Sequence, residues 1–165
     1  MAVASDGSEP GGAESGRRLG AELSDAESDA PLILVVEDDP SNAFVLKKII
    51  ERKGGRAEIV ASGREAVDAC RQKRYAIIMM DLRMPELDGF DATREIVTGE
   101  NLNNQTPIVA ITADTTEGIE RRCLKLGMRH YIAKPIRASV ISDIIAEFTR
   151  SALEKKLPKD DQGQS

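Results

Sequence analysis

Residues 76–89 read AIIMMDLRMPELDG, an unbroken apolar run that ends in Asp81 and continues into a short polar loop. A run of this kind, without alternation, is typical of a strand that helices bury on both faces of a parallel sheet. Asp81 then stands at the carboxyl end of the strand, where open α/β sheets bind their ligands. The stretch therefore predicts an α/β fold and a carboxylate at its functional edge.

Three further apolar runs also end in polar or charged groups. LILVV at 32–36 precedes Glu37, Asp38 and Asp39, PIVAIT ends in Thr112, and YIAKP carries Lys134. Because the carboxyl ends of parallel strands meet at one edge of a sheet, we expect these side chains to converge with Asp81.

Between its two ends the chain alternates strand-like and helix-like segments. The expected order is strand 32–36, helix about 41–53, strand 57–60, helix about 63–73, strand 76–80, helix about 89–98, strand 107–111, helix about 115–126, strand 130–133 and helix about 138–150. Five such units predict a doubly wound, five-stranded parallel sheet with helices on both faces. Ser62 with Glu65 predicts a capping box, and Gly127 predicts a helix end.

Composition and length indicate one folded domain with tails. The chain has 165 residues, of which 41% are apolar, enough for one core of ordinary size. We expect a disordered, acidic, Gly- and Ser-rich tail over 1–30, a folded domain over 31–150 and a flexible tail over 151–165. No stretch approaches the roughly 18 apolar residues of a membrane span, and no secretory leader is visible. The sequence thus predicts a cytoplasmic protein without membrane contact.

The charge of the chain is unevenly distributed. Residues 1–30 hold seven acids and two arginines, whereas residues 31–150 hold eighteen acids and eighteen bases. A neutral domain without a basic arm gives little electrostatic reason to bind nucleic acid. Cys70 and Cys123 belong to no metal-like spacing, so we expect both to pack as reduced, apolar side chains.

Helical phase predicts which side chains face outward. In the first helix Val45, Leu46 and Ile49 share the expected core face, and Phe44 lies opposite them. In the helix over 115–126, Leu124 falls outside the core stripe, among the basic residues Arg121, Arg122 and Lys125. Phe44 and Leu124 are candidate partner contacts, although exposed apolar side chains are also common on ordinary surfaces.

The acids at the strand ends form a candidate metal site. A flavodoxin-like strand order of 2-1-3-4-5 places the first and third strands side by side, so that Glu37, Asp38 and Asp81 share one crevice. Carboxylates a few ångströms apart repel one another, and a cluster of oxygen ligands favours Mg²⁺. Acids that only cap the following helices are the alternative; this explains Asp39 better than Asp81.

These motifs carry a family resemblance. VVEDDPSN, MMDLRMPELDG, AITAD and YIAKPI resemble the acidic turn, phosphoacceptor loop, switch and lysine-proline end of receiver domains in two-component signalling, the CheY-like response regulator family. The first and third motifs are more similar to receivers of phosphorelays and hybrid kinases than to the chemotaxis type. The resemblance covers the central 120 or so residues.

The resemblance implies a phosphoacceptor site. Asp81 would take a phosphoryl group from a histidine kinase or a histidine phosphotransfer protein. Mg²⁺ would be held by Asp38, Asp81 and the backbone carbonyl of Arg83, with Glu37 acting through water. The resemblance also implies chemistry only at the chain's own Asp81, so the protein is not expected to be an enzyme acting on other substrates.

The same resemblance implies a switch. Lys134 and Thr112 would bind phosphoryl oxygens, and Tyr131 would turn inward on activation. The output face would be the helix over 115–126, the strand over 130–133 and the last helix, with Arg137 among its exposed members, and its downstream protein target is open. The helix that carries Phe44 would dock the phosphodonor.

Two flanking positions suggest control of the phospho-form's lifetime. Arg83 lies two residues after Asp81, and Asp114 lies two residues after Thr112. We expect both side chains to hang over the entrance as a bidentate pair that crowds the path of an attacking water.

Other functions fit the sequence less well. A haloacid-dehalogenase-type phosphohydrolase needs a second aspartate at the position of Arg83, and a dinucleotide site needs a glycine-rich turn after the first strand. A phosphate-independent adaptor with the receiver fold stays an alternative. Whether the chain is a stand-alone receiver or part of a hybrid kinase stays open.

Overall fold

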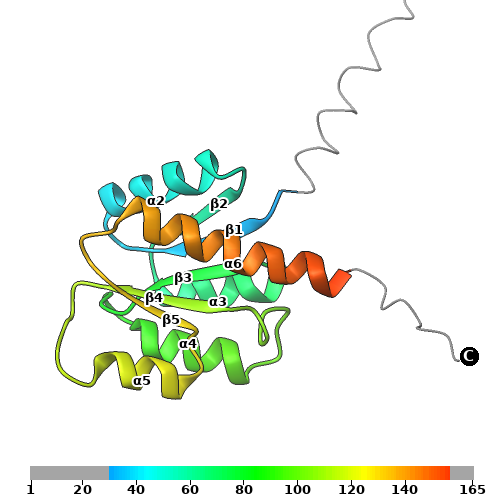
Figure 1. The fold of residues 1–165 in the computed structure, drawn as a ribbon. Helices are drawn as coiled ribbons and strands as arrows, with labels where there is room; N and C mark the ends of the chain where they lie inside the picture. Colours follow the sequence, from blue (N-terminus) through cyan, green and yellow to red (C-terminus); the bar gives the residue numbers. More distant parts are fainter. Residues whose placement is uncertain (1–29, 157–165) are drawn as a thin grey trace, which may run out of the picture. The chain divides into compact units, whose positions relative to one another are not determined.

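The computed structural model describes residues 30–156, with side chains described through residue 150. Five strands form one parallel sheet (Figure 1): β1 (Leu32–Val36), β2 (Arg56–Val60), β3 (Ile77–Asp81), β4 (Ile108–Thr112) and β5 (His130–Ala133). Their order is β2-β1-β3-β4-β5. The flavodoxin-like fold predicted from the sequence is therefore confirmed.

Helices cover both faces of the sheet. They are α2 (Pro40–Arg52), α3 (Gly63–Gln72), α4 (Gly89–Thr98), α5 (Ile119–Leu126) and α6 (Ala138–Lys156). Figure 1 shows α2 and α6 on one side of the sheet and α4 and α5 on the other. Side chains alternate between two cores: Ile33 and Val35 pack with α2 and α6, whereas Leu34 and Val36 pack with α3, α4 and α5. Burial on both faces explains the unbroken apolar runs.

The helix starts follow from local hydrogen bonds. Asp39 caps α2 by accepting from the backbone N–H groups of Ser41 and Asn42, and Asp88 caps α4 in the same way. The Ser62 hydroxyl oxygen accepts from the Glu65 N–H, and Gly127 ends α5 at a φ of 101°. The Ser62 cap and the Gly127 helix end are confirmed. The capping box is incomplete, because the Glu65 carboxylate accepts from the Ala61 N–H and the Ser62 hydroxyl and not from the Ser62 N–H.

Two helices differ from the expected boundaries by more than one residue. α5 begins at Ile119, four residues later than expected, because the Asp114 carboxylate accepts from the Thr116 N–H and Gly118 takes a left-handed φ of 85°. Side-chain bonds of this kind hold the segment in a turn. α6 continues to Lys156 and so includes the first six residues of the expected C-terminal tail. The rest of that tail, and residues 1–29, lie outside the described residues.

The predicted phase of α2 was wrong at one position. Val45 is 46% exposed, and the buried positions are Ala43, Leu46, Ile49 and Ile50. Small Ala43 faces the sheet, so the core stripe is rotated by about one position from the expected one. Phe44 is 59% exposed, as expected.

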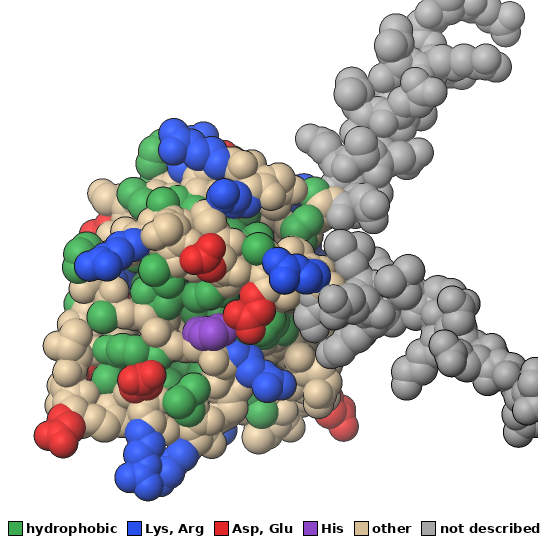
Figure 2. All heavy atoms as spheres, in the orientation of Figure 1, with side chains coloured by type: hydrophobic (Ala, Val, Ile, Leu, Met, Phe, Trp, Pro, Cys, Tyr) green, Lys and Arg blue, Asp and Glu red, His purple; other side chains and the backbone are tan. Residues whose placement is uncertain are grey.

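Within residues 30–156, no helix is long and apolar enough to cross a membrane. Cys70 and Cys123 are both buried as free thiols. Burial raises the pKa of the Cys70 thiol to about 12, in keeping with the expectation of inert, packed cysteines. The face seen in Figure 2 intermixes acidic, basic and hydrophobic side chains, in keeping with the balanced charge of residues 31–150.

Gly89 makes the turn between β3 and α4 possible, and we expect Gly89→Ala to destabilise the protein. An added Cβ would clash with the carbonyl oxygen of Asp81 and lie 2.8 Å from the Leu82 Cα. Overpacking of this kind costs about 1–3 kcal/mol, whereas alanine gains about 1 kcal/mol of helix propensity over glycine. Urea unfolding should therefore show a net loss of stability.

Gly118→Ala is the matched control, because its Cβ would meet nothing within 4 Å and only its left-handed φ opposes the change. It should cost no more than about 1–2 kcal/mol and leave the Asp81 loop undisturbed in NMR spectra. A Gly89→Ala protein as stable as the parent would contradict the close approach.

Candidate functional site

The carboxyl ends of β1 and β3 bring three acids together. Val36 pairs with Met80 in the sheet, so Glu37 and Asp81 follow at neighbouring positions. Glu37, Asp38 and Asp81 each offer a carboxylate oxygen, and these oxygens lie within 4.8 Å of one another. Glu37 and Asp81 are buried, whereas Asp38 is exposed to solvent. Such an all-oxygen set suits a hard divalent cation.

Lys134 supplies the positive charge of the site. Its Nζ donates to Glu37 Oε2 at 2.7 Å and to Asp81 Oδ2 at 3.2 Å. Desolvation lowers the pKa of Lys134, but the bonds to Glu37 and Asp81 outweigh it, so that its pKa is raised. Burial is the main cause that raises the pKa of Glu37. The cluster is thus one ammonium facing an excess of carboxylates.

Asp39 lies outside this cluster and caps the N-terminus of α2. Its Oδ1 accepts from Ser41 N at 2.8 Å and from Asn42 N at 2.9 Å. The helix-cap interpretation therefore holds for Asp39. Asp81 has a different role, because its Oδ1 accepts from the Arg83 N–H at 3.0 Å and its Oδ2 faces Lys134.

Thr112, Asp114 and Tyr131 form a connected group beside the cluster. Thr112 is fully buried, and its hydroxyl oxygen accepts from the Asp114 N–H at 3.1 Å. The Tyr131 hydroxyl donates to the Asp114 carbonyl at 2.7 Å, and its ring packs against the core on the α4–α5 side. In this structure both groups hold the backbone of Asp114. No motif in the sequence indicated that Asp114 would link them.

Arg83 and Asp114 meet across the entrance, as expected from their positions. Arg83 Nη2 and Nε donate to Asp114 Oδ2 at 2.6 and 3.1 Å. The contact differs from the predicted fork onto two oxygens, because Oδ1 of Asp114 accepts from the backbone and hydroxyl of Thr116. Hydrogen bonds from Thr116 and then from Arg83 lower the pKa of Asp114 to about 2, so the pair stays charged at neutral pH.

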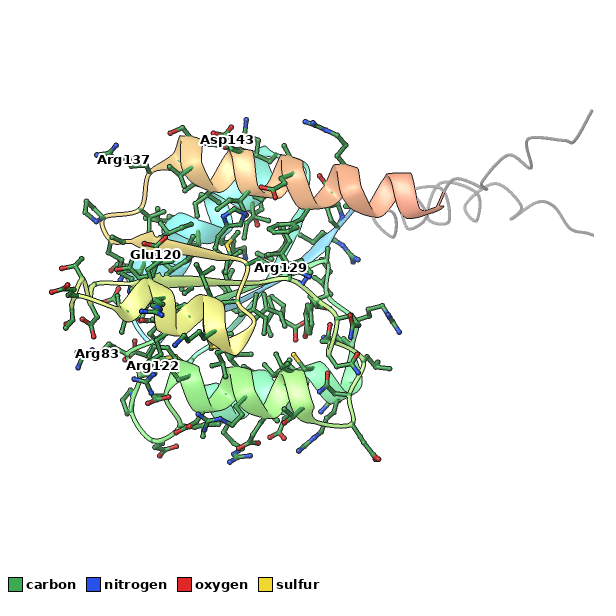
Figure 3. All side chains as sticks on the ribbon, turned by 60° about the horizontal axis from the view of Figure 1, so that its bottom comes forward. Arg83, Glu120, Arg122, Arg129, Arg137 and Asp143 are labelled. Carbon is green, nitrogen blue, oxygen red and sulfur yellow. The ribbon has the colours of Figure 1, made fainter. Side chains whose placement is uncertain are left out.

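The candidate docking residues are all exposed, but Arg122 lies apart from the others. Leu124 is 50% exposed, and Arg121, Lys125 and Arg137 are exposed too. Arg122 does not join them on one face, because its guanidinium lies over the Phe90 ring of α4 at 3.8 Å from the centroid. Figure 3 shows Arg122 near Arg83, on the α4 side of α5, and Arg137 far from both near α6. The sequence could not indicate this contact, since it joins residues of different helices.

Family comparison gives a direct match. The profile described as response regulator receiver domain matches residues 33–146. That range runs from the second residue of β1 through the other four strands and into α6.

Curated relatives are much longer than this chain. The GacS sensor protein of Pseudomonas syringae pv. syringae is 34% identical over 134 residues, which cover 80% of this chain and 15% of that protein. The autoinducer 2 sensor kinase/phosphatase LuxQ of Vibrio vulnificus is 35% identical over 116 residues, which cover 70% of this chain and 13% of LuxQ. The chain therefore matches about one seventh of these relatives.

Solved structures share the fold. The receiver domain of sensor histidine kinase PA1611 from Pseudomonas aeruginosa is 39% identical, with a TM-score of 0.66 over 72% of this chain and 97% of that chain. It holds a magnesium ion coordinated in its active site cleft. A CheY-like receiver domain protein from Methanospirillum hungatei has a TM-score of 0.68 at 20% identity, covering 76% and 99% of the two chains.

Proposed function

Because this chain belongs to the response regulator receiver domain family, we propose that it is a phosphoacceptor of a two-component phosphorelay. Asp81 takes a phosphoryl group from the phosphohistidine of a histidine kinase or a histidine phosphotransfer protein. The observation that carries the proposal is the setting of Asp81, at the end of β3 between an acidic cluster and the Lys134 ammonium.

Magnesium fits the acidic cluster. Three carboxylates with one ammonium leave uncompensated negative charge, and Mg²⁺ is bound by one or two carboxylates together with a phosphate. Asp38 and Asp81 would hold the ion, with Glu37 through water and the Arg83 carbonyl as a further ligand. The Mg²⁺ in the PA1611 receiver domain supports this assignment. When bound, the ion neutralises charge on the phosphoryl oxygens.

Transfer needs placement and charge more than covalent help. The phosphorus–nitrogen bond of the donor breaks as an oxygen of Asp81 bonds to phosphorus, through a loose transition state. Lys134 Nζ lies 3.2 Å from Asp81 Oδ2, close enough to donate a hydrogen bond to an oxygen of the transferred phosphoryl group. Ala113 leaves the approach to Asp81 open, because its side chain is only a methyl group.

The signal is a change in the loop after β4. The Thr112 hydroxyl now accepts from the Asp114 N–H, and a phosphoryl oxygen beside it would draw the hydroxyl away as a donor. Asp114 would then lose one of the groups that hold its backbone. A phosphate that contacts only one arrangement of the loop favours that arrangement by its differential binding. The expected output face is α5, β5 and α6.

Intact mass after incubation with acetyl phosphate and Mg²⁺ tests the proposal. One added phosphoryl group, absent when EDTA removes the metal, is the expected result. Asp38→Ala should need far more Mg²⁺ for the same labelling. No addition under any metal condition would instead favour the alternative of a phosphate-independent adaptor.

Phe44 is proposed to contact the phosphodonor. It is 59% exposed on α2, the helix that follows the acidic turn, and the Lys48 Nζ lies 5.5 Å from its ring centroid. Phe44→Ala should slow transfer from the phosphorylated donor by about tenfold, since aromatic anchors dominate such interfaces. The neighbouring exposed residue provides the control Val45→Ala. Equal transfer rates for Phe44→Ala and the parent, with both folded, would make Phe44 ordinary surface.

The Arg83–Asp114 pair is proposed to prolong the phospho-form. Its contact spans the two loops that border Asp81 and crowds the line along which water attacks the acyl phosphate. The Arg83→Ala, Asp114→Ala double variant should therefore lose its phosphate several-fold faster, followed by intact mass after removal of acetyl phosphate. Thr115→Ala, in the same exposed loop, should decay like the parent. A double variant that decays no faster would place the control of lifetime elsewhere.

A further inference from the structure

A groove of about 550 Å³ opens between the loop after Asp81 and the start of α5. Its walls include the apolar side chains of Leu82, Met84, Phe90 and Ile119. Arg83 and Arg122 lie at its rim, on the same side of the molecule (Figure 3). Volumes in this range are typical of sites that hold a ligand or a few side chains of a partner.

The two acids of the groove are already engaged. Asp88 caps α4 by accepting from the Asp91 N–H at 2.9 Å. The oxygens of Asp114 accept from Arg83 and Thr116. Arg83 is paired with Asp114 by the same contact, so its guanidinium is not free to bind an incoming carboxylate.

Arg122 is the charged side chain of the groove that can still bind a carboxylate. Among residues 30–150 no ion pair joins it to a carboxylate, and its guanidinium lies 3.8 Å from the Phe90 ring centroid. Stacking uses the face of the guanidinium and leaves its N–H donors free in the plane, where a carboxylate binds as a fork. Arg121 and Lys125 are exposed on the same helix but do not line the groove.

Both walls belong to the segments proposed to switch. Arg83 donates its backbone N–H to Asp81, and Asp114 is held by Thr112 and Tyr131. A change at Asp81 or Thr112 therefore moves a wall of the groove. Arg83 and Arg122, which line the groove, lie on the α4 side of α5, away from Arg137 (Figure 3).

From this charge and shape we infer that the groove docks a segment of a partner protein that carries a carboxylate next to a large apolar side chain. The carboxylate pairs with Arg122, and the apolar side chain packs on Ile119, beside the Arg122–Phe90 stack. Interfaces concentrate their binding energy in such arginine and aromatic anchors. A dependence of this binding on phosphorylation rests on the proposed function, whereas the docking itself does not.

The probe is a panel of capped heptapeptides in which two carboxylates flank one leucine, isoleucine, phenylalanine or tryptophan. Binding to the whole chain is followed by NMR, with the signals of Phe90 and Ile119 as the readout. At least one peptide should bind saturably there, about tenfold more weakly to Arg122→Gln and equally to Arg121→Gln, the matched control. A panel in which lysines replace the acids should not bind.

Three outcomes would overturn the inference. They are no saturable shift in the groove with any acidic peptide, equal affinity for Arg122→Gln and the parent, or phenylacetate binding as tightly as the best peptide, which would make this a small-molecule site. The panel is repeated after acetyl phosphate treatment, where unequal affinities support the link to the switch and equal ones overturn it. If Asp81 takes no phosphate while the peptide still binds, the proposed function fails and the docking site stands.

Discussion

An Asp81→Asn variant is expected to take up no phosphoryl group from acetyl phosphate and Mg²⁺, whereas the parent takes up one. Asparagine has nearly the same shape, so the buried position at the end of β3 is kept. Its amide is a far poorer nucleophile and metal ligand than a carboxylate. The loss should therefore be complete rather than partial, as measured by intact mass.

The neighbouring acids are the competitors in this experiment. Glu37 is engaged by Lys134 and by the Asp39 N–H at 3.2 Å, and Asp38 is exposed. Asp38→Asn is the control, because it should still be labelled at high Mg²⁺. Undiminished labelling of the Asp81→Asn protein would show that one of these acids is the acceptor and would contradict the assignment of Asp81.

A Lys134→Met variant is expected to lose roughly 2–3 kcal/mol of unfolding free energy at neutral pH. Glu37 and Asp81 would then face one another without their ammonium, and breaking a buried pair costs about 3–5 kcal/mol. Lys134 is 17% exposed in its side chain, and solvent beside it reduces that figure. Urea unfolding measures the loss, and added Mg²⁺ should stabilise the variant more than the parent.

The loss should depend on pH in a defined direction. Burial raises the pKa of Glu37 above 4.5, and the Lys134 bond is the main effect that opposes this. Without Lys134 the pKa rises further, so Glu37 takes up a proton as pH falls through that value, and the deficit shrinks. For the parent, the raised pKa of Lys134 means that its stabilisation is complete below 10.5 and is lost as pH rises beyond it.

A second variant isolates the charge effect. Glu37→Gln combined with Lys134→Met removes one of the two unpaired carboxylates, so it should recover part of the stability and lose most of the pH dependence. If Lys134→Met unfolds like the parent at all pH values, Lys134 does not compensate the acidic cluster.

Strands were easier to predict than helix faces. The run over 76–80 needs burial on both sides wherever it lies, so its apolar character alone indicated β3. The face of α2 depends on which of several rotations packs best on the sheet, and the structure buries Ala43 and exposes Val45, which was expected in the core. The start of α5 depended on the bonds between Asp114 and Thr116 and on the left-handed Gly118.

Parts of the candidate site were equally accessible from the sequence. Parallel strands carry whatever follows them to one edge, so the convergence of Glu37, Asp38, Asp81 and Lys134 follows from strand ends and strand order. The Arg83–Asp114 contact could be expected for the same reason, although the bonds from Thr116 changed its geometry. Functional roles for these residues are proposals that the experiments above test.

By itself the sequence determined the parallel sheet, the edge that carries the site and the acids, hydroxyl and ammonium that meet there, because periodicity and strand ends are local properties of the chain. Only the tertiary structure decided that Arg122 stacks on Phe90 and that the Tyr131 hydroxyl donates to the carbonyl of Asp114. These contacts join segments distant in the chain, and the packing of helices on the sheet selects them. The periodicity of neighbouring residues carries no information about contacts between segments that are distant in the chain.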